Sequence, residues 1–435
     1  MTLPLVGLLG IFVLLAVMLL LKIPVGFAMG LVGFLGMAYV ISWNAALGLL
    51  GTDLWGTFST YGLTVIPMFI LMGQICFYSR VNERLYKAAY KWFGQTRGGL
   101  AITTVWACAG FAAICGSNTA TAATMTAVAL PEMKKYKYAP VLTAGSIAAG
   151  STLGVVIPPS VVLVVYGLYT GESIGKLFFG SFVPGLILAF LMAATVYVMC
   201  VVHPDWGPRG PKSSLPEKIR SLPQAVDMLL LFGIIMYSLY AGLFTPSEAG
   251  AAGSVVALLI GVVRRKLTFS GFCSALFDTL RISAMIFVIV AGAVLFGRFL
   301  AVTRLPYEAA AWVASLPVPP WMVLWSMIAI YMIGGCIMDA LAFLLISIPI
   351  FLPVALQMGY DPIWFGIVIT VVTTLGAITP PVGINAYIVS GMAKDIPLGT
   401  VFRGVVWFLP SYVITLIAIE VFPQVVTFFA SLVKN

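Results

Sequence analysis

Long uncharged apolar runs recur along this chain and limit its fold more than any other feature. The first run covers residues 3–21, and a helix of about 20 such residues crosses the hydrocarbon core of a bilayer. Apolar residues make up 61% of the 435 residues and charged residues 9%, against about 25% charged in an ordinary globular domain. Runs this long favour helices over the strands of about 10 alternating residues found in a membrane barrel. The chain is therefore expected to be an all-α polytopic membrane protein.

The apolar runs predict ten spans and two re-entrant helical hairpins. The stretches 98–133 and 320–356 are each interrupted midway by small and polar residues, so a helix that enters and returns fits them better than one span. The polar, proline-rich connection 203–224 separates the chain into two halves. The expected spans are 3–21, 23–42, 54–80, 140–170, 176–202, 225–243, 246–263, 273–300, 360–392 and 398–424.

The two halves are related by a shift of 222 residues. Without gaps, this shift aligns 131–159 with 353–381 and gives nine identities in 29 positions, where chance predicts about two. Pro24 and Pro246 fall on the same offset. Convergent use of proline at helix starts is the alternative, but it does not explain one register over this length. Each half holds five spans and one hairpin, and the odd number predicts that the repeats are inverted.

Charge orients the spans. Threading them places 19 of the 23 Lys and Arg residues on one side, and only Lys176, Arg298, Arg304 and Lys434 on the other. The positive-inside rule makes the first side cytoplasmic, so both termini are expected to lie outside the cytoplasm. The net charge of +9 is then a topology signal, and nucleic acid is not an expected partner.

Each half also carries a Gly-x-x-x-Pro-Pro break inside a span, in GVVIPPS and in GAITPPVG. Proline has no amide hydrogen, so the carbonyls of Gly154 and Val155, and of Gly376 and Ala377, are expected to lack helical partners. Such carbonyls could bind sodium, and the N-terminal end of the next half-helix could hold a carboxylate. A kinked helix whose carbonyls bond to neighbours is the alternative. Two breaks at matched positions favour a binding site.

The first hairpin tip, Gly116-Ser117-Asn118-Thr119, offers three side-chain oxygens. At the offset of 222, Ser117 corresponds to Asp339, the only acidic residue expected near the middle of the membrane. An intramembrane carboxylate predicts a functional site, although Asp339 could instead cap the second hairpin helix. Thr379 and Asn385 add polar oxygens near the second break.

The motifs GSNTATAATM, ALPEM and STLGVVIPPS, followed in the second half by PIFLPVALQMGYDP and LGAITPPVGINAYI, resemble the large membrane (M) subunit of tripartite ATP-independent periplasmic (TRAP) transporters. The resemblance covers nearly the whole chain. It implies a scaffold and a mobile transport domain that work as an elevator in the bacterial inner membrane, with sodium ions as coupling ions. It also implies an extracytoplasmic substrate-binding protein and a small membrane subunit of about four spans. That subunit is expected to be a separate chain, because no four-span extension precedes residue 1.

The resemblance assigns the two tips and the two breaks to the ion and substrate sites. The expected substrate-binding residues are Ser117, Asn118, Thr119, Ser160 and Asn385. The expected sodium ligands are Ser117, Asn118, Gly154, Val155, Pro158, Asp339, Gly376, Thr379, Pro380 and Gly383. The expected division is 1–80 scaffold, 81–97 amphipathic arm, 98–175 transport domain, 176–202 scaffold span, 203–224 cytoplasmic linker, 225–303 scaffold, 304–319 arm, 320–397 transport domain, and 398–435 scaffold span and C-terminus.

Other functions are expected less strongly. A self-sufficient sodium/carboxylate symporter would share these features without needing partners. A membrane-embedded enzyme is disfavoured because no His, Cys or carboxylate cluster converges in a span, and a channel because paired broken helices are typical of transporters. The six cysteines are expected to be core residues. No Lys or Arg lies in the expected site, so C4-dicarboxylates, sialic acid and sugar acids all remain open as substrates.

Overall fold

The computed structural model describes residues 2–211 and 213–433, and these residues form helices with no strand among them. The all-α prediction is confirmed. Lys212 and Lys434, which the charge count includes, lie outside the described residues. The helices at the first two expected spans of each half agree closely with those spans. They are α1 (Leu3–Leu21), α2 (Val25–Val40), α13 (Val226–Tyr240) and α14 (Pro246–Val263).

The expected span 54–80 is wrong at its start. The structure has a separate helix α3 (Trp43–Phe58), a short 3-10 turn at Tyr61–Thr64, and then α4 (Val65–Tyr78). The Ser42 side chain caps α3 by accepting from the amide of Ala45. After α3, the hydroxyl of Thr60 bonds to the carbonyl of Gly56, so the Ser-Thr-Tyr-Gly segment ends the helix before the apolar run begins.

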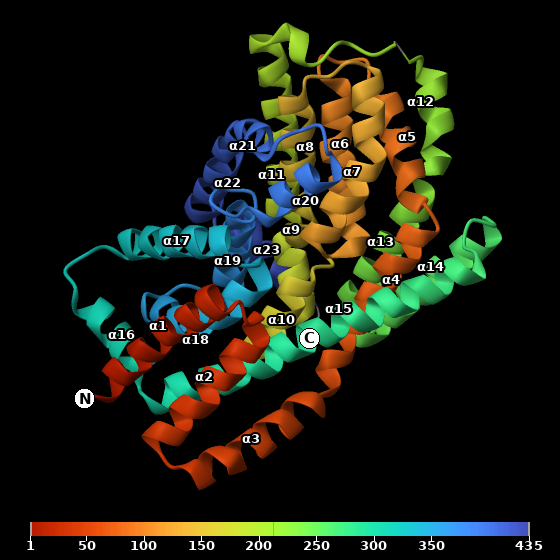
Figure 1. The fold of residues 1–435 in the computed structure, drawn as a ribbon. Coiled ribbons are helices and arrows are strands. Elements are labelled where there is room, and N and C mark those ends of the chain that lie inside the picture. Colours follow the sequence, from red (N-terminus) through yellow and green to blue (C-terminus); the bar gives the residue numbers. More distant parts are fainter. Residues whose placement is uncertain (1, 212, 434–435) are drawn as a thin grey trace.

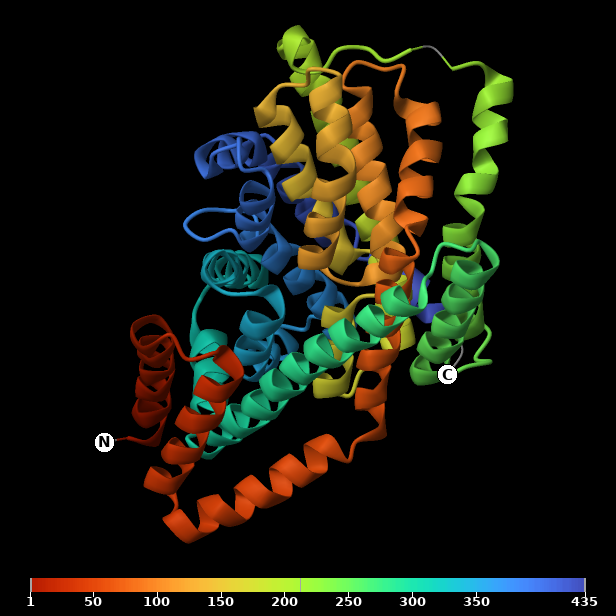
Figure 2. The ribbon, with the colours of Figure 1, turned by 45° about the vertical axis from the view of Figure 1, so that its right-hand side comes forward.

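A long helix, α15 (Phe269–Val302), runs diagonally through the molecule (Figures 1 and 2). Helix α2 packs along it, and α3 lies at the outer edge of the same region. On the other side of α15 stands a bundle that contains α6 (Gly99–Cys115) and α7 (Asn118–Lys135).

Two helical hairpins occupy the stretches where hairpins are expected. The first joins α6 to α7 through residues 116 and 117, and the second joins α17 (Pro320–Ile337) to α18 (Ala340–Gln357) through residues 338 and 339. Each tip is only two residues long, so the N-terminal end of the second helix in each hairpin lies directly at the tip.

Two helices are broken at the Pro-Pro pairs. In the first half, α8 (Pro140–Ser151) and α9 (Leu153–Val156) are separated from α10 (Val161–Thr170), and in the second half α19 (Pro362–Gly376) is separated from α20 (Ile384–Met392). The Pro158–Pro159 and Pro380–Pro381 peptide bonds are both cis.

The helix bounds follow the sequence offset. Helices α7 and α18 begin at residues 118 and 340 and end at 135 and 357, and α8 and α19 begin at 140 and 362. Each pair of bounds differs by 222. The inverted orientation of the halves in a membrane, the periplasmic termini and the division into scaffold and transport domain stay predictions.

The remaining helices are shorter or bent, apart from α11. Two of them, α5 and α16, lie where the two arms are expected. The final span bends by 41° between α21 and α22. These helices are α5 (Val81–Phe93), α11 (Ile174–Val202), α12 (Leu215–Ser221), α16 (Leu305–Ser315), α21 (Leu398–Val406), α22 (Leu409–Val421) and α23 (Gln424–Ser431).

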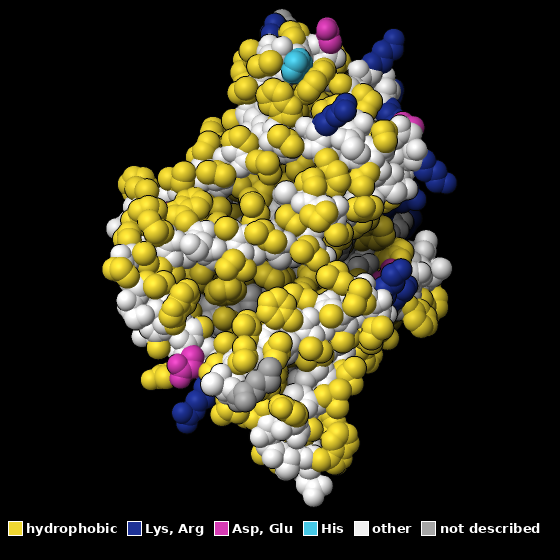
Figure 3. Space-filling model, turned by 60° about the vertical axis from the view of Figure 1, so that its left-hand side comes forward, with side chains coloured by type: hydrophobic (Ala, Val, Ile, Leu, Met, Phe, Trp, Pro, Cys, Tyr) yellow, Lys and Arg dark blue, Asp and Glu magenta, His cyan; other side chains and the backbone are white. Residues whose placement is uncertain are grey.

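Apolar and charged side chains occupy different parts of the surface, and the helices differ in how deeply they are buried. On the face in Figure 3, hydrophobic side chains cover a broad middle band, whereas Lys, Arg, Asp and Glu gather toward the ends and the right-hand edge. By length and composition, eight helices among the described residues could cross a membrane, or ten if each of two bent pairs is one span. Residues 142–167 are all buried, whereas Leu3–Leu21 has only two buried residues, Gly7 and Leu14. The broken helix is therefore at the centre, and α1 is at the perimeter.

Candidate functional site

A cavity of about 510 Å³ lies where the two hairpin tips approach each other. Its wall takes residues from both halves, including Ser117 at the first tip, Val155 at the first break and Asp339 at the second tip. Helices α4 and α15 close the remaining side. This volume lies within the range of about 300–1,000 Å³ that is typical of small-molecule sites.

The first tip presents several polar groups to this cavity. Ser117 caps α7, and its hydroxyl oxygen accepts a hydrogen bond from the amide of Ala120 at 3.4 Å. The Ser117 and Thr119 hydroxyls lie 3.1 Å apart, and Asn118 Oδ1 accepts from the amide of Thr119 at 2.8 Å. Asn118 Nδ2 is buried and has no partner. A buried donor without an acceptor is costly, so a ligand oxygen at the tip would satisfy it.

The first break packs directly against this tip. The amide of Val161 donates to the carbonyl of Gly116 at 3.3 Å. Any side chain at Gly154 would put its Cβ 2.6 Å from the Ser117 carbonyl oxygen. Only glycine permits this approach. The tip and the break are therefore held together as one local unit.

The second break makes the matching contacts but is bonded differently. The amide of Val382 donates to the carbonyl of Cys336 at 3.2 Å, and a Cβ on Gly376 would lie 2.5 Å from the Gly335 backbone. However, the carbonyl of Gly376 accepts from the amide of Thr379, and the carbonyl of Ala377 accepts from the amide of Asn385, both at 3.0 Å.

The expectation of two unpartnered carbonyls in the second break is therefore wrong. The chain makes a tight turn after Gly376, and the start of α20 folds back so that its amides reach these carbonyls. In the first break, the carbonyls of Gly154 and Val155 lack helical partners as predicted. Pro158 and Pro159 have no amide hydrogen to donate to them.

Asp339 both caps a helix and lines the cavity. It is the N-cap residue of α18, and its Oδ2 accepts from the amide of Leu341 at 3.0 Å. Among the described residues, no Lys, Arg or His forms an ion pair with Asp339. The carboxylate is thus supported by a helix end alone, and the N-terminal end of α18 favours its negative charge.

The structure divides the predicted site residues into two groups. Five line the cavity, namely Ser117, Asn118, Thr119, Val155 and Asp339. The others do not line it, and they are Gly154, Pro158, Ser160, Gly376, Thr379, Pro380, Gly383 and Asn385.

Three polar residues of the second group have other bonds. The Ser160 side chain caps α10 by accepting from the amide of Leu163 at 3.4 Å, and the hydroxyl of Thr379 donates to the Leu375 carbonyl at 2.7 Å. Asn385 is fully buried, and its Nδ2 donates to the Ser151 hydroxyl at 2.9 Å. Its Oδ1 has no partner. A buried carbonyl oxygen of this kind is a suitable cation ligand.

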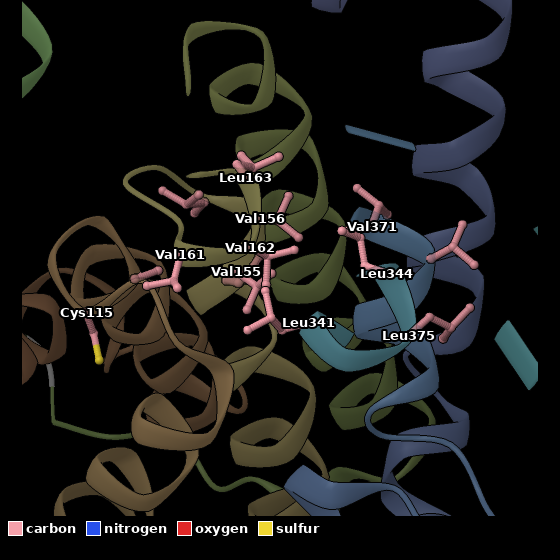
Figure 4. Packing of buried hydrophobic residues seen from close by; sticks show 14 of the residues in the cluster. Cys115, Val155, Val156, Val161, Val162, Leu163, Leu341, Leu344, Val371 and Leu375 are labelled. Carbon is pink, nitrogen blue, oxygen red and sulfur yellow. The ribbon is translucent and has the colours of Figure 1, made fainter. Parts of the chain in front are cut away.

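Sequence reasoning missed the walls that lie outside the tips and breaks. Gln74 on α4 lines the cavity, and its signal is a lone amide side chain within an apolar run. Met285 and Ile384 also line it, and nothing in the apolar pattern distinguishes them from other core residues. Figure 4 shows Leu341 of the second hairpin beside Val155 and Val162. Helices α10 and α18 pack against each other, which joins the two halves beside the cavity.

No transition-metal centre competes with this interpretation. Among the residues that the structure describes, no group of three His, Cys, Asp or Glu side chains gathers in one place. Five cysteines are buried and Cys273 is half-buried, and all six are free thiols. The cysteines are therefore core residues, as expected.

Comparisons with known proteins agree on one family. The family model described as "Tripartite ATP-independent periplasmic transporter, DctM component" matches residues 12–425. The chain is 37% identical over 377 residues to the C4-dicarboxylate TRAP transporter large permease protein DctM of Pseudomonas aeruginosa, covering 86% of this chain and 88% of that one. It is 32% identical over 407 residues to the sialic acid TRAP transporter large permease protein SiaM of Vibrio cholerae, with coverage of 92% and 93%.

A solved structure shares the fold. The YdaH transporter of Alcanivorax borkumensis superposes with a TM-score of 0.65 and 16% identity, covering 87% of this chain and 89% of that chain. At this identity, the likeness concerns the fold alone.

Proposed function

The chain belongs to the DctM component family of tripartite ATP-independent periplasmic transporters, and from this premise we propose that it imports a small organic acid in symport with sodium ions. Members of the family are multi-pass inner-membrane permeases that work with a small membrane subunit and a substrate-binding protein. The chain is a transport subunit and not an enzyme. The substrate class, the coupling ion and the motion are the proposed parts.

One observation carries the proposal: both hairpin tips line one cavity, and Asp339 is the only charged residue on its wall among the residues that the structure describes. No Lys or Arg lines this cavity to neutralise a carboxylate. A bound organic anion would therefore depend on Asn118 Nδ2, on the N-terminal ends of α7 and α18, and on a cation that accompanies it. That dependence supports obligatory coupling of the anion to a cation.

Sodium is the cation that the available ligands favour. The carbonyls of Gly154 and Val155, the buried Oδ1 of Asn385 and the carboxylate of Asp339 are all oxygen ligands, which hard cations prefer. A proton relay would need a chain of titratable groups across the membrane. Asp339 is the one titratable carboxylate on the cavity wall.

The proposed motion is that of an elevator. Each hairpin is bonded to its own break, through Val161 to Gly116 at the first tip and through Val382 to Cys336 in the last turn of α17. Leu341 and Val155 then join the two halves. These contacts support a single moving body that carries both tips past α1, α2 and α13, and they disfavour separate gating of each tip.

The proposed substrate is a small carboxylate. The relatives transport different organic solutes by name, including C4-dicarboxylates in P. aeruginosa and sialic acid in V. cholerae. Both classes carry a carboxylate, which is the group that helix ends and sodium bind. The rival proposal is a self-sufficient symporter of the same fold, which would need no binding protein.

Uptake into proteoliposomes tests both the coupling to sodium and the rival proposal of a self-sufficient symporter. The permease would be reconstituted with its small subunit, and the cognate binding protein would be added outside, loaded with radiolabelled substrate. We expect uptake driven by an inward sodium gradient and none with choline and a pH gradient alone. Equal uptake in choline would contradict sodium coupling. Uptake of free substrate by the permease alone would favour the self-sufficient symporter.

A further inference from the structure

A second cavity, of about 570 Å³, lies one helical turn from the first. Its wall is formed by the end of α4, the first turn of α5, the middle of α7 and the loop that leads into α15. This volume is also within the range of small-molecule sites. The cavity is not part of the site described above, and no predicted site residue lines it.

The two cavities follow the same helices. On α4, Gln74 lines the first cavity and Tyr78 the second. On α7, Ala120 lines the first and Thr124 the second. Residues four apart lie on the same helix face, so the two cavities lie in line along α4 and α7, and we call this line the track. The track runs from the hairpin tip toward the end of the molecule that the charge pattern predicts to be cytoplasmic.

The second cavity is basic where the first is not. Arg80, Arg265 and Lys266 line it, against a single acidic residue, Glu83, whose Oε1 lies 3.8 Å from Arg80 Nε. The nearby carboxylate of Asp278 accepts a hydrogen bond from the Tyr78 hydroxyl at 2.6 Å. The lining therefore keeps an excess of positive charge, which attracts anions.

An unpartnered amide gives a second, independent indication of a ligand. Asn82 lines the cavity, is only 4% exposed, and its Oδ1 is buried without a partner. Asparagine carries two amide donors beside that oxygen. The unpartnered Oδ1 is an acceptor, which bridging water would satisfy. The Nδ2 of Asn82 also donates no hydrogen bond among the described residues, so it is free to donate to a ligand oxygen.

We propose that this cavity binds a free carboxylate, that of the transported acid, between the central site and the cytoplasm. Arg80 and Arg265 would hold the carboxylate oxygens and Asn82 would orient them. The arginine guanidinium matches a carboxylate in shape, and both arginines are exposed residues of the cavity wall. Helices α4, α7 and α15 contribute residues to both cavities, so the occupant we propose is the transported acid and not a lipid. This inference rests on the proposed function for the direction of movement.

Arginine labelling tests the site without transport. Purified permease in detergent would be treated with phenylglyoxal, and the modification of each arginine would be followed by mass spectrometry. The probe is succinate, a C4-dicarboxylate, added in sodium-free buffer with ionic strength held constant by choline chloride. We expect succinate to slow modification of Arg80 and Arg265 by at least about threefold and to leave the exposed Arg209 and Arg403 unchanged.

Two substitutions make the test specific. Asn82→Leu should abolish the protection while every positive charge remains, and Lys137→Gln should retain it. Lys137 is a matched control, because it shares the left-handed backbone conformation of Arg80 and Arg265 but does not line the cavity. If Asn82→Leu does not fold, Lys266→Gln at the rim should still weaken the protection.

Three results would overturn the inference. They are no protection by succinate, equal slowing at all arginines, or protection only by vesicles that contain phosphatidylglycerol, which would indicate a lipid headgroup. Sodium-driven uptake is measured separately. Arginine protection with no sodium dependence of uptake would leave this site standing and remove the proposed coupling.

Discussion

The first proline break is buried throughout, whereas the second reaches the surface, although both follow the same sequence pattern. Residues 153–163 are all buried, but residues 379–382 are half-buried or exposed. Both breaks hold a cis Pro-Pro bond, and each is bonded to its own hairpin. The two breaks thus share the same backbone arrangement, but they differ in the residues that surround them.

The chemistry of the two regions differs in a complementary way. The first break has carbonyls that its prolines leave free, beside the neutral hydroxyl of Ser117. The second break has its carbonyls of Gly376 and Ala377 bonded to backbone amides, beside the carboxylate of Asp339. A cation bound by both regions would meet neutral dipoles on one side and a fixed charge on the other. The same backbone arrangement therefore occurs with two different sets of polar groups.

The largest expected effect on uptake comes from substitutions at the two glycines where each break closely approaches its hairpin. Gly154→Ala and Gly376→Ala would each drive a Cβ to about 2.5 Å from backbone atoms, and overpacking of this kind costs about 1–3 kcal/mol. This energy corresponds to a factor of about 5 to 150, so we expect uptake by either variant to fall at least about fivefold. Gly233→Ala, where no atom lies within 4 Å, is the control. If only one of the two variants lost activity, the breaks would not be equivalent in their backbone role.

The charge difference should give the next largest effect. Asp339→Asn keeps a good N-cap for α18 but removes the negative charge from the cavity wall. We expect the sodium concentration for half-maximal uptake to rise about tenfold, because a nearby opposite charge contributes more than a neutral ligand. The assay is uptake in proteoliposomes over a sodium titration. An unchanged sodium requirement would mean that Asp339 only caps the helix.

Ser117→Ala should have a smaller effect on the same titration. The change removes one neutral hydroxyl, and we expect a rise of about threefold in the sodium requirement. Ser214→Ala in the polar linker removes an equivalent helix cap, because its hydroxyl also accepts from an amide at 3.4 Å, and it should leave the requirement unchanged. Equal effects of Ser117→Ala and Asp339→Asn would contradict the charge asymmetry between the two regions.

The sequence predicts well the features that the two breaks share. It predicts poorly how the breaks differ in burial and in hydrogen bonding. The prolines and the tip motifs give the breaks, the hairpins and the offset of 222, because backbone bonding depends on local residue types. Burial of Val155 and exposure of Pro380 depend on which helices pack around each break. The bonds to Gly376 and Ala377 depend on how α20 folds back, which no local pattern encodes.

The polar residues of the candidate site were predictable from the sequence, but its apolar wall was not. Ser117, Asn118 and Asp339 interrupt apolar runs, so their polarity identifies them. The cavity walls contributed by Met285 and Ile384 come from distant helices, and such apolar residues give no signal in a single sequence. The start of α3 was missed because a serine cap and an arginine partner for Asp53 stabilise a helix whose pattern resembles part of a span.

The smallest expected effect concerns a surface link between the two regions. Lys134 at the end of α7 donates to Asp395, after α20, at 2.5 Å. This bond lowers the pKa of Asp395, so its contribution is complete above the ordinary pKa of an aspartate, about 4, and is lost only as pH falls further. Between about pH 5 and 8 we expect no pH dependence of the melting temperature from this pair, and only a small change in Lys134→Met. A large loss in that variant would show that the regions depend on this link.

Distance measurement between spin labels tests most directly whether the two regions move as one body. Labels would be placed at Ala113 beside the first tip, at Ile337 beside the second, and at Leu229 on α13, in a background without the six native cysteines. We predict a bimodal distance between residues 113 and 229 that shifts with sodium and substrate, and a nearly constant distance between residues 113 and 337. A fixed distance to α13 with a variable distance between the tips would contradict the common body and indicate separate gates.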